Sequence, residues 1–169
     1  LLHELMERRF HVETTTDVAE KELGVFDAVF FMTPTRPFSE AEREALDAFL
    51  SIGGKIVLVA DHTDLYGHGR AINSFVRAHG VSVRYDAVFV PHNKHAKAHL
   101  NNVLSPTTRM MTPCSISLGQ NTAVLAFCPD FVAENADYTR PNFFAEMRAT
   151  PDDRYGTFPL VTATSAGGG

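Results

Sequence analysis

Residues 55–73, KIVLVADHTDLYGHGRAIN, decide the fold that the sequence predicts. The apolar run 56–60 leads directly into four polar residues, and a glycine-containing turn then opens a helical pattern. A strand, a polar loop and a helix in this order place a binding site at the carboxyl end of a strand in an open α/β sheet. We therefore expect the polar loop to lie at a ligand-binding edge of a sheet.

The preceding segment completes a strand–helix–strand unit. Residues 27–33, DAVFFMT, form an apolar run that is typical of a strand buried on both faces of a parallel sheet. Ser39 and Glu42 have the spacing of a capping box at the start of a helix, which Gly53 and Gly54 then end. A helix that joins two strands of one sheet in this way makes them parallel.

The rest of the chain continues the alternation of helices and strands. Helices are expected at 1–10, 18–23 and 69–79, a helical turn at 142–148, and strands at 11–16, 81–90, 122–127 and 158–164, while 92–102 fits a helix or a loop. Such alternation predicts a parallel sheet with helices on both faces. The predicted fold is therefore α/β, a flavodoxin-like (Rossmann-type) three-layer sandwich with a mostly parallel central sheet.

The composition is that of a soluble globular domain. A chain of 169 residues with 44% hydrophobic residues can form one domain with a sizeable core. The net charge of −5 and the scattered basic residues argue against a nucleic-acid partner. No apolar run approaches the ~20 residues of a membrane span. Cys114 and Cys128 lack zinc-type spacing and are too few for a disulfide framework. One disulfide between them is an alternative, and free buried thiols are favoured.

The two ends of the chain predict a piece of a longer polypeptide. The chain begins inside a helical pattern at Leu1 and ends in three glycines after an apolar, strand-like run. We expect a single domain over residues 1–169, with further strands supplied before residue 1 and after residue 169. The compartment is left unassigned, because targeting signals can lie outside this piece.

The candidate site residues gather at the expected strand ends. Carboxylates and imidazoles close together can hold a divalent cation, bind a polar ligand or act as an acid/base pair, or the carboxylates can simply cap the next turn. Tyr66 and Arg70 can offer a stacking face and an anion contact, although a structural or solvated role is favoured for each, and Gly67 lets the backbone approach a ligand. The expected ligand-binding residues are Thr33, Thr35, Asp61, His62, Thr63, Asp64, His68 and Asn73.

Metal-dependent hydrolysis is the alternative function. It would use Asp61, His62 and Asp64, with His68 or His92 as a further ligand and a divalent metal ion as cofactor. In the main interpretation no cofactor and no catalytic residue are expected.

A second histidine group, His92, His95 and His99, shares one face only if its segment is helical. The neighbouring Lys94 and Lys97 favour a solvated segment over a metal site. We therefore expect EDTA to leave the melting temperature unchanged and mass spectrometry to detect no bound metal. A lower melting temperature in EDTA would contradict this expectation.

Residues 39–61, SEAEREALDAFLSIGGKIVLVAD, carry a family resemblance when read with the apolar strand and proline-containing loop before them. The order of elements is similar to the class I glutamine amidotransferase-like fold. It resembles the non-catalytic offshoots of that superfamily, the DUF4350-type domains of bacterial membrane-associated proteins and the GIFT domain of intraflagellar transport proteins. The resemblance covers residues 1–90. It implies a crevice at the sheet edge and a soluble domain attached to membrane segments outside this chain.

The departures from that family disfavour amidotransferase chemistry. The turn that carries the nucleophilic cysteine in amidotransferases has Asp61 and His62 here, and no downstream His-x-Glu completes a triad. A carboxylate replaces a thiolate poorly in amide chemistry. We therefore expect a non-catalytic domain that binds a small polar ligand or a protein partner at the edge formed by residues 33–35 and 61–73.

Overall fold

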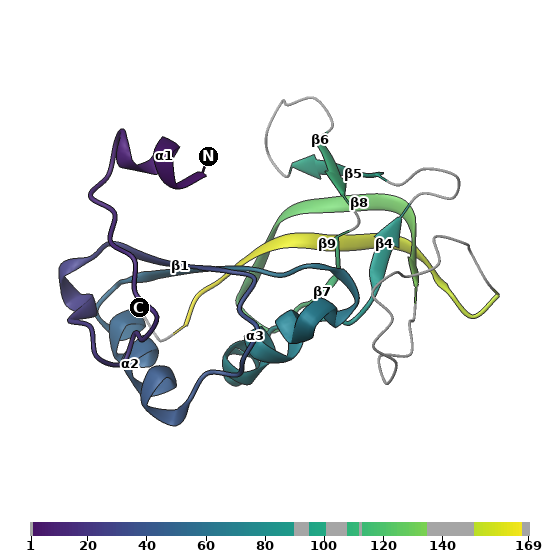
Figure 1. Cartoon of the computed structure of the whole chain (residues 1–169). Coiled ribbons are helices and arrows are strands. Elements are labelled where there is room, and N and C mark those ends of the chain that lie inside the picture. The colour runs from purple at the N-terminus through teal and green to yellow at the C-terminus, as the bar shows by residue number, and fades with distance from the viewer. Residues whose placement is uncertain (1, 90–94, 101–107, 112, 135–150, 167–169) are drawn as a thin grey trace.

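A computed structural model describes residues 2–89, 95–100, 108–111, 113–134 and 151–166 (Figure 1). The helices are α1 (Leu2–Glu7), α2 (Glu40–Ser51) and α3 (His68–Val76), with short 3-10 helices η1 (Leu23–Val25), η2 (His62–Gly67) and η3 (Arg77–His79). The strands are β1 (Ala28–Met32), β2 (Lys55–Val59), β3 (Ser82–Val83), β4 (Ala87–Phe89), β5 (His95–Leu100), β6 (Thr108–Met111), β7 (Ile116–Ser117), β8 (Thr122–Glu134) and β9 (Arg154–Thr164).

The predicted strand–helix–strand unit is confirmed. β1 and β2 pair in parallel, with Phe30 opposite Val57, and α2 connects them. The Ser39 hydroxyl accepts a hydrogen bond from the Glu42 amide at 3.2 Å, and the Glu42 carboxylate accepts one from the Ser39 amide at 2.8 Å. This is the capping box expected from the sequence, and it satisfies two amides that the helix itself leaves unpaired.

The mostly parallel three-layer sandwich is wrong. Within the residues that the structure describes, β1–β2 is the one parallel pair. β3 pairs with β7 antiparallel, and β8 pairs antiparallel with β4, β5 and β9. A parallel pair needs a crossover of a dozen or more residues, usually a helix. The described residues after η3 contain no helix, so their strands pair in opposite directions.

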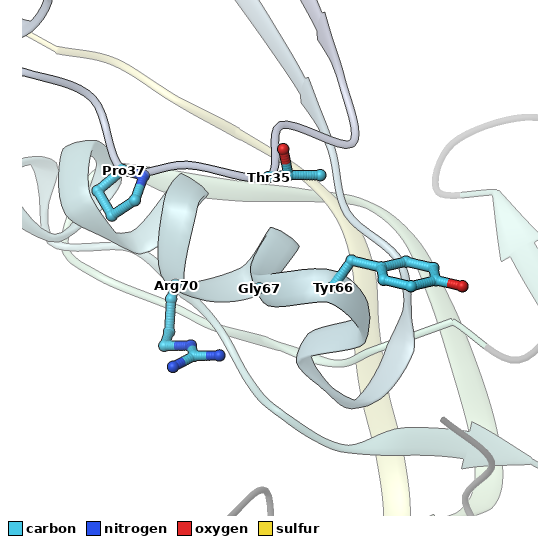
Figure 2. A pocket seen from close by; sticks show the side chains of 5 residues that line it. All are labelled: Thr35, Pro37, Tyr66, Gly67 and Arg70. Carbon is cyan, nitrogen blue, oxygen red and sulfur yellow. The ribbon is translucent and has the colours of Figure 1, made fainter. Parts of the chain in front are cut away.

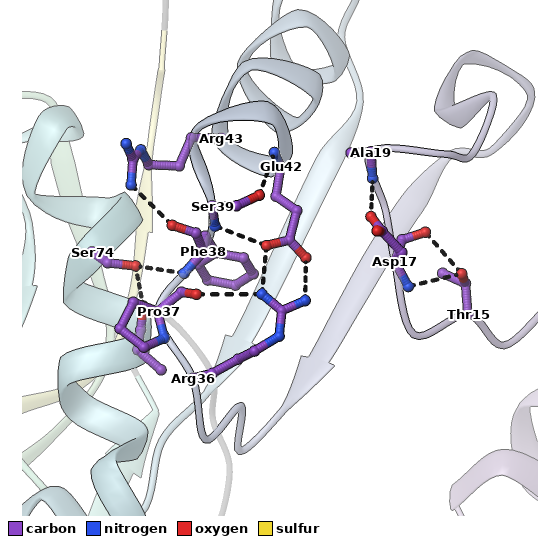
Figure 3. Close-up of polar contacts among 11 residues, drawn as sticks. Thr15, Asp17, Ala19, Arg36, Pro37, Phe38, Ser39, Glu42, Arg43 and Ser74 are labelled. Atoms are coloured by element: carbon purple, nitrogen blue, oxygen red, sulfur yellow. Dashed lines mark hydrogen bonds and ion pairs between the residues drawn. The ribbon is translucent and has the colours of Figure 1, made fainter.

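Several predicted elements differ from those observed. The strand expected at 11–16 does not form, because the Thr15 hydroxyl donates to the Asp17 carbonyl at 2.8 Å and the Asp17 carboxylate accepts from the Ala19 amide at 2.9 Å (Figure 3). Such local bonds compete with strand pairing. The helix expected at 18–23 does not form either, because the 3-10 helix η1 begins only at Leu23. The helix expected at 142–148 lies outside the described residues.

The expected strand 81–90 is split into β3 and β4 around Asp86. The Asp86 carboxylate accepts bonds from the Ser115 amide and hydroxyl and from Arg154 at 2.9 Å. The donors to this buried carboxylate, Ser115 and Arg154, come from distant segments of the chain. The chain turns at Asp86 to meet them and does not continue as one strand.

The main core lies between the β1–β2 pair and the helices α2 and α3. Figure 1 shows both helices on the same side of this pair. Phe38 packs edge-to-face against Phe31 and Phe75, with ring centroids 4.8 Å and 6.0 Å away. The buried part of the cluster comprises Val18, Leu23, Phe38, Leu46, Phe49 and Phe75.

The loop from Arg36 to Phe38 is held by polar contacts at both of its sides (Figure 3). Arg36 donates through both terminal nitrogens to the Glu42 carboxylate, each at 2.7 Å. The Phe38 amide donates to the Ser74 hydroxyl at 2.9 Å, which links the loop to α3. The bonds from Arg36 hold the pKa of the buried Glu42 at about 2, well below its ordinary value of 4.5.

We expect Glu42→Gln to lower the free energy of unfolding by about 1–3 kcal/mol, because a charge-assisted, buried acceptor is lost. The folded-state pKa of Glu42 is depressed, so its stabilisation is present above pH 4.5 and is lost as pH falls from about 4.5 to about 2. Denaturant unfolding at pH 7 and over this acidic range measures both effects.

The control is Glu44→Gln, at an exposed position of the same helix. It should leave the free energy of unfolding at pH 7 unchanged. An equal decrease in the free energy of unfolding for the two variants would contradict the role given to Glu42.

Candidate functional site

The chain is strained where β1 and β2 end. Thr33, Thr63, Asp64 and Tyr66 have positive φ angles of 49°, 51°, 50° and 51°, and Gly67 follows at 82°. Non-glycine residues rarely adopt this conformation, and the branched threonines least of all. Such strain persists where surrounding contacts fix the backbone, and it clusters at binding sites. The turns that follow two neighbouring strands are therefore rigid and candidate binding elements.

Asp64 fixes the second of these turns to the start of α3. Its Oδ1 accepts from the Arg70 amide at 2.8 Å, and its Oδ2 accepts from the Arg70 Nε at 2.6 Å. The Asp64 side chain is 4% exposed and that of Arg70 is 69% exposed. A carboxylate at a helix N-terminus also complements the helix dipole. Asp64 therefore positions Arg70, and its own carboxylate is buried.

Asp61, His62 and Thr63 contact one another. The Asp61 Oδ1 accepts from the His62 amide at 2.7 Å and lies 3.7 Å from the His62 Nε2. The His62 Nδ1 is 2.8 Å from the Thr63 hydroxyl, and the Thr63 amide donates to the Asp86 carbonyl at 3.0 Å. Burial lowers the pKa of His62, which the charge of Asp61 opposes. Of the three, Thr63 ties the turn to Asp86, the residue just before β4.

His68 and Asn73 are buried in α3. The Asn73 amide donates to the Val83 carbonyl at 2.9 Å and accepts from the Val83 amide at 3.0 Å, so it holds β3 and not the loop at 61–64. His68 is 6% exposed, and its Nδ1 has no hydrogen-bond partner among the described residues. Both side chains belong to the packing behind the turn.

An open hollow of about 270 Å³ lies between the loop after β1 and the start of α3. It is lined by Thr35, Pro37, Tyr66, Gly67 and Arg70, which Figure 2 shows on these two facing segments. A Cβ on Gly67 would stand 3.6 Å from the Thr35 carbonyl and 3.8 Å from the Arg70 Nη2. The missing side chain therefore leaves room in the hollow.

The residues that line the hollow differ from the ligand-binding residues expected from the sequence. Of the eight ligand-binding residues expected, Thr35 lines the hollow, while Asp64 and Asn73 serve the scaffold. Tyr66 and Arg70, for which a structural or solvated role was favoured, line the hollow together with Pro37. Their position on either side of a glycine, Gly67, is the sequence signal that could have identified them.

A metal site does not form among the described residues, where no three His, Cys, Asp or Glu side chains gather. Asp61 and Asp64 are turned to different partners, so their carboxylates do not converge as metal ligands must. His92 lies outside the described residues. His95 and His99 lie on β5, so the helical face considered for them is wrong.

The two cysteines are buried thiols, as expected. Burial raises the pKa of Cys114 and of Cys128 to about 12. The reactive species of a cysteine is its thiolate, which is scarce at neutral pH for such groups. Neither residue is suited to act as a nucleophile.

Comparisons with known proteins show a fold likeness alone. No family model and no curated protein matches the chain. A solved structure described as "mmIFT52 N-terminal domain" is similar, with a TM-score of 0.60 and 18% sequence identity over 74% of this chain. The likeness covers 63% of that structure. The resemblance to the glutamine amidotransferase-like superfamily and to DUF4350-type domains stays a prediction.

The described part of the chain contains no helix long and apolar enough to cross a membrane.

We expect Asp64→Ala to lower the free energy of unfolding by about 1–3 kcal/mol, because it leaves the Arg70 amide at the start of α3 without its acceptor. Asp61→Ala is the matched control, since the Asp61 side chain is 39% exposed and should cost clearly less. Chemical denaturation of both variants tests the difference. A larger loss for Asp61→Ala would contradict the scaffold role of Asp64.

Proposed function

We propose that this chain is a non-catalytic binding domain that receives a protein partner at the hollow lined by Thr35, Pro37, Tyr66, Gly67 and Arg70. The observation that carries the proposal is the position of this hollow, at the ends of two parallel strands whose turns are strained and rigid. A rigid surface binds with little loss of conformational entropy.

The groups around the hollow favour a hydrogen-bond acceptor such as a carboxylate. The Arg70 side chain is 69% exposed, and Asp64 holds its guanidinium through the Nε side. Arginine donors pair well with planar carboxylates. The Tyr66 side chain is 65% exposed at the same hollow and offers an aromatic face. An acidic side chain or a chain terminus of the partner fits the Arg70 guanidinium, while the Tyr66 ring points in another direction from the same segment (Figure 2).

The size of the hollow favours a partner protein over a small molecule. Its volume of about 270 Å³ is below the ~300–1,000 Å³ of sites that enclose small ligands. An open hollow of this size suits one or two side chains of a larger surface. A small polar ligand remains the second candidate occupant, because the same polar groups would bind it.

Two observations favour binding without catalysis. The buried thiols have pKa values of about 12, and the Asp64 carboxylate is committed to Arg70. The wider proposal, a non-catalytic amidotransferase-like domain of a membrane-associated protein, rests on the sequence resemblance.

The test is an NMR titration with N-acetylaspartate as a carboxylate probe and neutral N-acetylasparagine amide as its control. We expect the amides of Gly67 and Arg70 to shift with the charged probe and much less with the neutral one. Tyr66→Ala and Arg70→Gln should each lower the affinity for the charged probe at least tenfold, because each removes a side chain that lines the hollow.

Two matched variants serve as controls. Tyr155→Ala removes a tyrosine that is also 65% exposed but lies on β9, and Arg77→Gln removes an exposed arginine just after α3. Both should bind the probe like the unchanged chain. Equal weakening in the controls, or shifts centred elsewhere, would refute the proposed site.

A further inference from the structure

One face of the β1–β2 pair is apolar and exposed. Along both strands the side chains alternate: Val29, Phe31, Ile56 and Leu58 pack against the core. Those between them point the other way and form what we call the open face, with exposed fractions of 46% for Phe30, 54% for Met32, 37% for Val57 and 37% for Val59.

The four side chains of the open face form one continuous patch. The register sets Phe30 beside Val57 and Met32 beside Val59, at the ~4.7–4.9 Å spacing of neighbouring strands. α2 and α3 both lie on the opposite side of the pair (Figure 1). α1 is drawn on the side of the open face, yet the four side chains keep their exposure. Parallel strands are otherwise found with both faces covered.

Opposite charges stand at the two ends of the open face. Lys55 begins β2 and is exposed in the same alternation as Val57 and Val59. Asp61 follows two residues after Val59 with an extended backbone, and its side chain is 39% exposed. Six residues of extended chain separate the two charges by ~20 Å.

We propose that the open face is the contact between two copies of this chain, related by a two-fold axis with their strands antiparallel. A two-fold contact requires a surface that is complementary to itself. In this arrangement Lys55 of each copy meets Asp61 of the other, and the apolar side chains pack between the two pairs. Parallel strands would instead set the two lysines together, where their charges repel.

The size of the patch sets the strength of the contact. Four partly exposed side chains offer a few hundred Å² of apolar surface, on the scale of the largest patch of a typical monomer. Stable complexes bury ~800 Å² per partner. The dimer is therefore weak and reversible, and it forms at high protein concentration.

Analytical ultracentrifugation over a wide concentration range tests this contact. The average mass should rise from 18.6 kDa towards twice that value as the concentration increases. Val57→Glu should abolish the rise by placing a charge in the centre of the open face. Val161→Glu is the matched control, because Val161 is 39% exposed on β9, which pairs with β8 and not with β1 or β2. It should associate like the unchanged chain.

A charge exchange tests the orientation of the two copies. Lys55→Glu should weaken association at least tenfold, and Lys55→Glu with Asp61→Lys should restore it. Circular dichroism checks that each variant is folded, and Met32→Glu replaces Val57→Glu if the latter is not. A constant mass of 18.6 kDa at every concentration, or association unaffected by a charge on the open face, would overturn the proposal. If the double variant Lys55→Glu with Asp61→Lys associates as weakly as Lys55→Glu alone, the antiparallel arrangement is overturned.

Discussion

The Glu42 carboxylate connects the parts of the chain on which the rest of the structure depends. It accepts from Ser39 at the first turn of α2 and from Arg36 in the loop after β1, so one buried group sets both the start of the crossover helix and the path of the chain into it. The loop that it holds continues through Pro37 to Phe38, whose ring enters the core and whose amide reaches α3. The wall of the hollow opposite α3 therefore depends on this carboxylate.

Asp64 and Asp86 are two further buried carboxylates that hold separate segments together, around the turn after β2. Asp64 ties the strained turn after β2 to α3 and leaves the guanidinium of Arg70 exposed. Asp86 gathers Ser115 and Arg154 from later segments and, through its carbonyl, holds the Thr63 amide. Unpaired polar groups in these places would cost about 1–3 kcal/mol each, so pairing them is a condition for the turn. Several of the polar residues expected from the sequence to bind a ligand, Asp64 and Asn73 among them, act as such supports.

Local features of the fold could be predicted because their causes lie close together in the chain. The capping box needs only Ser39 and Glu42, and the parallel β1–β2 pair follows from two apolar runs with a helix between them. The direction of the later strands could not be predicted in this way. An apolar run such as 122–127 fits a parallel or an antiparallel neighbour equally well. The partner residues of β8 on β9 lie between 21 residues away (Ala133 opposite Arg154) and 42 residues away (Thr122 opposite Thr164).

The sequence by itself determined the strand–helix–strand unit of β1, α2 and β2, the helix α3 and the place where the chain leaves the sheet, because side-chain periodicity and helix caps act over a few residues. Only the tertiary structure decided which of the polar residues face outward at residues 55–73. Asp64 and Asn73 are drawn inward by the Arg70 and Val83 backbones, and Tyr66 and Arg70 are left outside around Gly67. It also decided that one face of β1 and β2 is exposed, since an apolar run records hydrophobicity but not whether a second layer covers it. Contacts between residues that are distant in the sequence set these orientations and exposures, and local sequence patterns do not predict such contacts.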